Sequence, residues 1–186
     1  MNPNFTVCRN VQPWEDFCVQ PPCGQLNPAE EGMYEVLGTV FSDMVEVFSP
    51  DTFHMGGDEI HIGCWRSSER ITNWLEDQGR GTTDEDFIWM WSQFQNKSYS
   101  KLRTASNGNT PEVILWSSHL TNEENIHNLV QDKMLNSLVT QLYSLFQDPS
   151  IYTIQVWADA SDCKDTTIRT VAEEGFRKED RVIKKK

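Results

Sequence analysis

Three short apolar runs, separated by longer segments with helical patterns, constrain the fold of this chain most strongly. Residues 52–56, 113–116 and 151–157 each combine strand-forming side chains with bounding turn residues, as buried strands do. The segments around these runs repeat apolar residues at helical spacing, and the expected helices cover 28–48, 67–78, 84–103, 122–146 and 164–174. Strands that alternate with helices indicate a parallel sheet covered by helices. The sequence therefore predicts an α/β fold.

Local capping signals set the expected helix boundaries. Asn27 is a suitable N-cap, and Pro28 is favoured at the first position of a helix. Ser49-Pro50-Asp51 should end that helix, and Gly79 should end the next one. Thr83 is expected to cap the helix that begins at residue 84.

Each predicted strand leads into a chemically distinctive residue. The first runs into Asp58 and Glu59, and the other two end at Trp116 and Trp157. In parallel α/β folds, and above all in the (β/α)8 barrel, functional sites form at the carboxyl ends of the strands. We therefore expect these residues to meet at one site.

The adjacent carboxylates Asp58 and Glu59 follow two glycines, Gly56 and Gly57. Neighbouring residues on a strand point to opposite faces, but the glycines relax the backbone so that both acids could turn to one side. Two carboxylates in a cleft suggest glycoside hydrolysis, although such pairs normally flank the scissile bond about 5 Å or more apart. A substrate that supplies its own nucleophile removes this difficulty.

Two other interpretations of the same stretch stay open at this point. The acids could be solvated side chains of an exposed turn. They could also bind a metal together with His54 and His61, although this ligand spacing matches no common metal-binding pattern.

Charge and composition exclude some classes of partner. The formal net charge of −12 argues against nucleic acid, because phosphate binding requires a basic face. No run of 18 apolar residues occurs, so no membrane span is expected, and the first residues lack the pattern of a signal peptide.

The cysteines favour disulfides over zinc, because no Cys-x-x-Cys pair is present. We accordingly expect a protein of the secretory pathway, extracellular or lysosomal. The triplets that begin at Asn4 and Asn96 are possible glycosylation sites. The five cysteines are Cys8, Cys18, Cys23, Cys64 and Cys163.

The stretch His54-Met-Gly-Gly-Asp-Glu59 resembles the H-x-G-G-D-E signature of family 20 glycoside hydrolases, the β-N-acetylhexosaminidases. The resemblance extends over about residues 5–130 and 151–176, and it points to insect members that act on chitin oligosaccharides or trim N-glycans. The blocks that carry it are 18–28, 53–65, 114–121 and 154–157. Chitin oligosaccharides and N-glycans are both left open as substrates.

The resemblance implies a role for each site residue. Asp58 would orient the 2-acetamido group of the substrate, and Glu59 would act as the acid and base. Trp116 and Trp157 would form walls of the acetamido pocket. Val19 would contact the next sugar.

Supporting residues and disulfides are also implied by the resemblance. His54, Gly56 and Gly57 would support the loop that carries the acids. Cys8 would pair with Cys64, and Cys18 with Cys23, which leaves Cys163 unpaired. The family mechanism requires no cofactor and no metal, and full-length members can dimerise.

Compared with the family, the chain is expected to span part of the (β/α)8 TIM barrel, from about the end of strand 3 through helix 6. The expected organisation is a disulfide-stapled segment, 1–27, then the partial catalytic domain, 28–176, and a basic tail, 177–186, with a possible insertion at about 131–147. Family residues from strands one, seven and eight have no counterpart here, so we expect little activity from these 186 residues alone. The alternative function is a truncated, non-catalytic product or a glycan-binding remnant.

Overall fold

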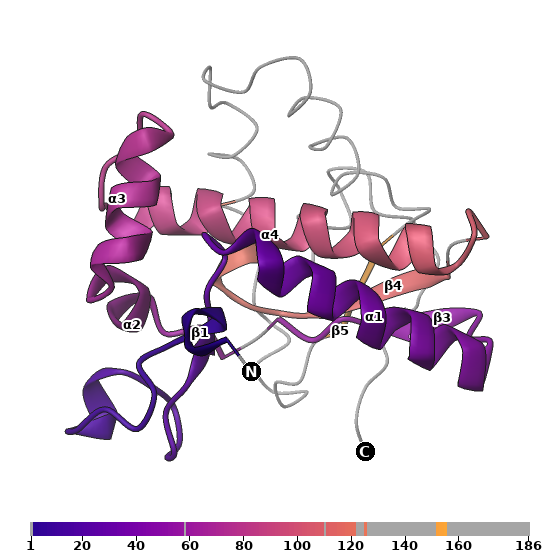
Figure 1. The fold of residues 1–186 in the computed structure, drawn as a ribbon, viewed down its shortest axis with the longest axis horizontal. Coiled ribbons are helices and arrows are strands. Elements are labelled where there is room, and N and C mark those ends of the chain that lie inside the picture. Colours follow the sequence, from indigo (N-terminus) through magenta and orange to yellow (C-terminus); the bar gives the residue numbers. More distant parts are fainter. Residues whose placement is uncertain (1, 58, 110, 122–124, 126–151, 156–186) are drawn as a thin grey trace, which may run out of the picture. The chain divides into compact units, whose positions relative to one another are not determined.

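The computed structural model describes residues 2–57, 59–109, 111–121, 125 and 152–155 (Figure 1). The chain divides into two compact units. The first unit comprises residues 1–49 and 59–110, and the second comprises residues 50–58 and 111–186. The boundary between the two units therefore falls between the two adjacent acids of the sequence.

The first unit begins with a largely irregular segment that contains one small antiparallel ladder. Strands β1 (Thr6–Val7) and β2 (Gln25–Leu26) pair with Thr6 opposite Leu26 and Val7 opposite Gln25. The short 3-10 helices η1 (Pro3–Phe5) and η2 (Trp14–Asp16) complete the segment. This ladder places Gln25 beside Val7, one residue before Cys8.

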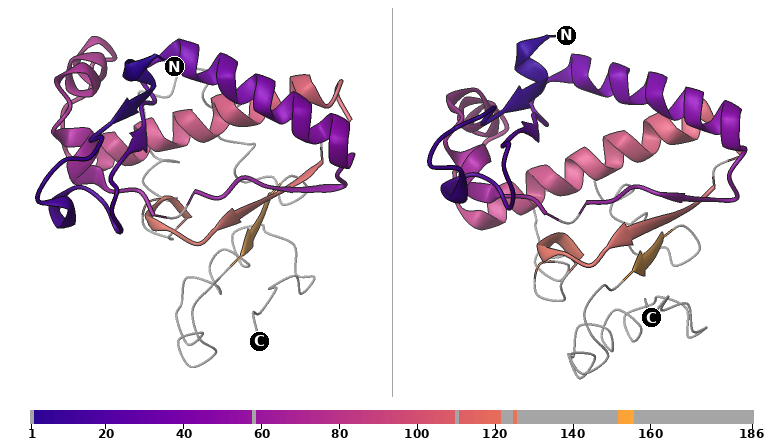
Figure 2. Two further views of the ribbon diagram at one scale, coloured as in Figure 1. Left: turned by 60° about the horizontal axis from the view of Figure 1, so that its bottom comes forward. Right: turned by 90° about the horizontal axis from the view of Figure 1, so that it is seen from below.

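Two long helices, α1 (Glu31–Phe48) and α4 (Asp84–Ala105), lie side by side in the first unit (Figures 1 and 2). Lys97 pairs with Glu31, and Lys101 pairs with Glu35 at 2.7 Å. Both partners advance by four residues in the same direction, so the two helices run parallel. Parallel neighbouring helices are what successive parallel strand–helix units produce.

Helix α1 begins later than the sequence predicted. Asn27 does not cap it: the Asn27 Oδ1 atom accepts a hydrogen bond from the Ala29 N–H at 3.1 Å, and its Nδ2 atom donates to the Asn4 carbonyl at 2.9 Å. Asn27 is buried and forms a turn that fastens the N-terminal segment. The helix starts only after this turn, with Glu30 at the cap position.

The helix expected at 67–78 is present as α3 (Glu69–Asp77), and a short helix that was not predicted, α2 (Ile62–Arg66), precedes it. Gly79 follows α3 with a φ of +71°, and the next residue, Arg80, donates its N–H to the Leu75 carbonyl at 2.9 Å, as in a glycine-terminated helix. The predicted cap of α4 is confirmed. Thr83 and Asp86 form a reciprocal capping box at its first turn.

Aromatic side chains dominate the core of the first unit. Trp65 and Trp91 are almost completely buried and meet edge to face, with ring centroids 6.3 Å apart. Tyr34 is also buried, and its hydroxyl donates to the Pro28 carbonyl at 2.9 Å. Burial raises the pKa of the Tyr34 phenol well above its ordinary value of 10.0, and the nearby charge of Glu31 raises the pKa further.

The second unit contains a three-stranded parallel sheet in the order β3–β4–β5. The strands are β3 (Thr52–His54), β4 (Glu112–Trp116) and β5 (Tyr152–Gln155). Val113 and Leu115 are buried and alternate with half-buried neighbours along β4. The 3-10 helix η3 (His119–Thr121) follows β4.

The predicted α/β class is therefore confirmed: the strands are parallel, and α2, α3 and α4 lie between β3 and β4 in the chain. The helices expected at 122–146 and 164–174 lie outside the described residues, and so does the C-terminal end of the third predicted strand. In the described part of the chain, no helix is long and apolar enough to cross a membrane.

Candidate active site

Strand β3 ends at the pair of glycines that precedes the acids. Its ladder with β4 continues past His54, because the Met55 N–H donates to the Ile114 carbonyl at 2.9 Å and the Trp116 N–H donates to the Gly56 carbonyl at 3.1 Å. Gly56 and Gly57 then adopt φ angles of +66° and +87°. Side-chain-bearing residues rarely adopt such angles, so glycine is what permits the chain to leave the sheet here.

His54 and Trp116 lie together at the carboxyl ends of two neighbouring strands. Their ring centroids are 4.6 Å apart, with the ring planes inclined by 50°. The Nδ1 atom of His54 accepts a hydrogen bond from the Gly56 N–H at 2.9 Å. The imidazole thus contacts the indole while it also holds the first residue of the glycine pair.

Two predicted site residues lie in the first unit and are exposed. Glu59 begins the segment that leads into α2, and its carboxylate makes no hydrogen bond to another residue within the described ranges. Val19, with 48% of its surface exposed, lies between the half-cystines of the Cys18–Cys23 disulfide. Asp58 and Trp157 fall outside the described residues.

The segment after Glu59 is fastened to the N-terminal segment by hydrogen bonds. The His61 N–H donates to the Gln25 Oε1 atom at 2.9 Å, and the Gln25 Nε2 atom donates to the His61 carbonyl at 3.4 Å. Four residues further on, the indole Nε1 of Trp65 donates to the Leu26 carbonyl at 3.0 Å. The strand β2 therefore contacts this segment at two positions.

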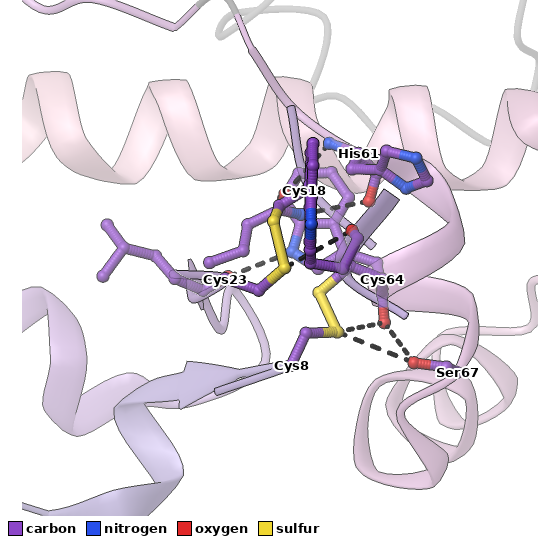
Figure 3. Close-up of a disulfide and its surroundings, with 10 residues drawn as sticks. Cys8, Cys18, Cys23, His61, Cys64 and Ser67 are labelled. Atoms are coloured by element: carbon purple, nitrogen blue, oxygen red, sulfur yellow. Dashed lines mark hydrogen bonds between the residues drawn. A yellow bond between two sulfur atoms is a disulfide. The ribbon is translucent and has the colours of Figure 1, made fainter. Parts of the chain in front are cut away.

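A disulfide between Cys8 and Cys64 adds a covalent link between the same two parts of the chain (Figure 3). The Cα atoms of the two half-cystines are 5.9 Å apart, and Cys64 is completely buried. The Ser67 hydroxyl donates to the Cys64 carbonyl at 2.8 Å. The two disulfides of the structure, Cys8–Cys64 and Cys18–Cys23, are those that the family resemblance implied.

Sequence reasoning missed Gln25 and Trp65 as parts of this arrangement. Both residues lie in blocks that carry the family resemblance, 18–28 and 53–65, and each follows a half-cystine closely. No local pattern relates either residue to its partner, which is 36 or 39 positions away in the sequence.

The described residues define an α/β protein whose distinctive side chains stand at and just beyond the carboxyl ends of parallel strands, the position where enzymes of this class carry their sites. The catalytic domain of glycosyl hydrolase family 20 matches residues 2–178. The chain belongs to this family of glycoside hydrolases.

Three relatives illustrate how the family match is distributed. The chitooligosaccharidolytic beta-N-acetylglucosaminidases of Ostrinia furnacalis and Bombyx mori are 38% and 35% identical over 94% and 93% of this chain. A probable beta-hexosaminidase of Drosophila melanogaster, fdl, is 31% identical over 84% of it. The chain spans 26% of the length of each of the first two relatives and 19% of the third.

Proposed function

We propose that this protein is a β-N-acetylhexosaminidase, which removes terminal non-reducing N-acetylhexosamine by a retaining, substrate-assisted mechanism. The observation that carries this proposal is the family match over residues 2–178, which includes the His54–Glu59 signature at the end of strand β3. The substrates are chitin oligosaccharides or N-glycans. The similarity to the chitooligosaccharidolytic enzymes of Ostrinia furnacalis and Bombyx mori favours chitin oligosaccharides.

In the first step, the acetamido oxygen of the substrate attacks the anomeric carbon C1 and forms a cyclic oxazolinium ion. The bond between C1 and the glycosidic oxygen breaks, and the Glu59 carboxyl donates its proton to that leaving oxygen. Asp58 accepts the acetamido N–H, which orients the nucleophile and stabilises the positive charge that develops on it.

In the second step, the Glu59 carboxylate removes a proton from water as the water attacks C1 on the face that the leaving group vacated. The oxazolinium ring opens, the acetamido group is restored, and the product keeps the β configuration. An exposed Glu59 is consistent with a group that must exchange protons with both a leaving group and water.

Trp116 and Trp157 serve as walls of the acetamido pocket, where an indole surface excludes water from the reacting group. The contact between Trp116 and His54 supports this role, since it fixes the indole at the end of β4. Val19 contacts the next sugar unit from the disulfide loop, where it directly follows Cys18 and its exposed side chain is available to a ligand.

The fold that accompanies this function is part of a (β/α)8 barrel, with β3, β4 and β5 as successive strands of its wall. The parallel order β3–β4–β5 supports this assignment. The two disulfides and the family membership support a protein of the secretory pathway, extracellular or lysosomal.

The test uses the full-length gene product and two nitrophenyl glycosides that differ only at C2. The N-acetyl-β-glucosaminide should be hydrolysed, and the β-glucoside should not, because it lacks the acetamido nucleophile. Proton NMR of the first product should show the β anomer before mutarotation. Equal hydrolysis of both glycosides, or an α product, would contradict the proposal.

A further inference from the structure

The structure points to Gln25 as a positioning residue for Glu59. We propose that the Gln25 carboxamide, together with the Cys8–Cys64 disulfide, fixes the backbone segment that carries the Glu59 carboxyl. This inference rests on the proposed function, because it assumes that Glu59 is the acid and base of the reaction.

The direction of the Glu59 side chain depends on what holds it. Within the described ranges its carboxylate makes no hydrogen bond, and its side chain is exposed. No hydrogen bond among the described residues sets the direction of this side chain, so the backbone that carries it matters for its placement. Two residues after Glu59, the His61 backbone makes hydrogen bonds through both its N–H and its carbonyl.

Gln25 is hydrogen-bonded to the backbone of His61. Gln25 uses both ends of its carboxamide, since Oε1 accepts from the His61 N–H and Nε2 donates to the His61 carbonyl. This arrangement requires a donor and an acceptor side by side on the same planar group, which the glutamine carboxamide supplies. Glutamate can accept but cannot donate, and methionine can do neither well.

Strand β2, which carries Gln25, is itself held by neighbouring parts of the chain. Gln25 lies in strand β2, and its ladder partner Val7 is followed directly by Cys8, which is bonded to Cys64. The Trp65 indole donates to the carbonyl of Leu26, the other residue of β2. Links from β2 and from Cys8, which directly follows β1, therefore reach residues 61, 64 and 65, and together they restrain the segment that follows Glu59.

Close packing at the His61 ring further restrains the segment that follows Glu59. A Cβ atom added to Gly63 would come within 2.9 Å of the His61 Cε1 atom and 3.3 Å of the Asp16 carbonyl oxygen. The His61 ring is thus confined by α2 on one side while its backbone is held by Gln25. Displacement of a catalytic group by 1 Å costs on the order of a hundredfold in rate, so this confinement bears directly on acid catalysis.

The test compares two substrates in the full-length gene product. A chitin oligosaccharide has a poor leaving group and needs protonation by Glu59, whereas a 2,4-dinitrophenyl N-acetylglucosaminide has a good one and does not. The quantity kcat/KM is measured because it reports the steps up to departure of the leaving group. Gln25→Met should lower kcat/KM for the oligosaccharide about tenfold more than for the aryl glycoside.

Two further variants sharpen the result. Gln78→Met is the matched control: the same substitution at an exposed glutamine that follows α3, which should leave the substrate ratio unchanged. Gln25→Glu retains the acceptor for the His61 N–H but loses the donor, and it should change the ratio by less than Gln25→Met.

The outcomes separate this inference from the proposed function. If the wild-type protein hydrolyses neither substrate, the proposed function fails, and this inference fails with it. If the wild type is active but Gln25→Met lowers both substrates by the same factor, or lowers neither, only the positioning role is overturned. If Gln25→Met does not fold, Gln25→Glu decides, and a failure of both to fold would make Gln25 a folding residue and overturn the proposal.

Discussion

The imidazole of His54 lies against the indole of Trp116, with ring centroids 4.6 Å apart, while its Nδ1 atom accepts the Gly56 N–H at 2.9 Å. One side chain therefore connects the aromatic residue at the end of β4 with the glycine pair that precedes the acids. These two contacts use different parts of the imidazole, so substitutions can separate them.

Replacement of His54 should separate binding from turnover. His54→Phe keeps an aromatic ring beside Trp116 but loses the acceptor for the Gly56 N–H, so kcat should fall while KM changes little. His54→Asn keeps an acceptor that can reach two residues along the chain but loses the ring, so KM should rise more than kcat falls. Steady-state kinetics on an N-acetylglucosaminide measures both effects. If both variants change only stability and leave kcat and KM unchanged, the link to the site is wrong.

The two disulfides should differ in their contribution to stability. Cys8–Cys64 closes a loop with a sequence separation of 56, and Cys18–Cys23 closes one with a separation of 5. Chain-entropy arguments give about 4 kcal/mol for the first and about 2 kcal/mol for the second. Denaturant unfolding of the paired Cys→Ser variants tests this order. A larger loss from removal of Cys18–Cys23 would contradict it.

Val19 should affect substrates that extend beyond the first sugar more than it affects monosaccharide substrates. Val19→Gly removes an exposed side chain, so the fold should be unaffected, while kcat/KM for a chitin oligosaccharide should fall by a few-fold. The value for a nitrophenyl N-acetylglucosaminide should fall less. An equal effect on the two substrates would argue against a contact with the next sugar.

The buried Tyr34 should make the protein sensitive to alkaline pH. Burial raises the pKa of its phenol in the folded state above the ordinary value of 10.0, so the unfolded state loses its proton first as the pH rises. The stability contributed by Tyr34 is fully present below pH 10.0 and declines above it. Tyr34→Phe should remove this decline from a plot of unfolding free energy against pH, at a cost near pH 7 of about 1 kcal/mol for the lost bond to Pro28. An unchanged alkaline slope would contradict this.

The capping box at Thr83 should account for about 1 kcal/mol of stability. Thr83→Ala removes the side-chain acceptor for the Asp86 N–H and should lower the free energy of unfolding by that amount. The neighbouring Thr82→Ala is the control. Among the described residues, Thr82 accepts a hydrogen bond from Arg66 through its carbonyl, which alanine keeps. Equal losses from both substitutions would show that the cap is not responsible.

Local signals in the sequence predicted the parts of the fold that depend on local chemistry. Two strands, which lead to the glycine pair and to Trp116, could be recognised because short β-branched and apolar runs lie between turn residues. The start of α4 could be recognised because Thr83 is a preferred N-cap residue, and Asp86 completes the capping box three positions later. Asn27 was misassigned because its amide bonds to Asn4, 23 positions away, instead of capping α1.

The supporting structure around the acids depends on distant contacts and could not be predicted in this way. The five-residue helix α2 has little propensity of its own and is held by the Cys64 disulfide and by the burial of Trp65. The Gln25–His61 pair likewise joins residues that no local pattern relates. The roles of Asp58, Glu59, Trp116 and Trp157 were inferred from the family signature and stay predictions.

The central claim is that Glu59 donates a proton to the leaving group while the substrate supplies the nucleophile. The most direct measurement is kcat/KM of Glu59→Gln in the full-length gene product, with a chitin oligosaccharide and with a 2,4-dinitrophenyl N-acetylglucosaminide. The oligosaccharide should lose on the order of a thousandfold, and the activated aryl glycoside less than about tenfold, because the aryl group leaves without protonation. An equal loss on both substrates, or full activity on the oligosaccharide, would contradict the account.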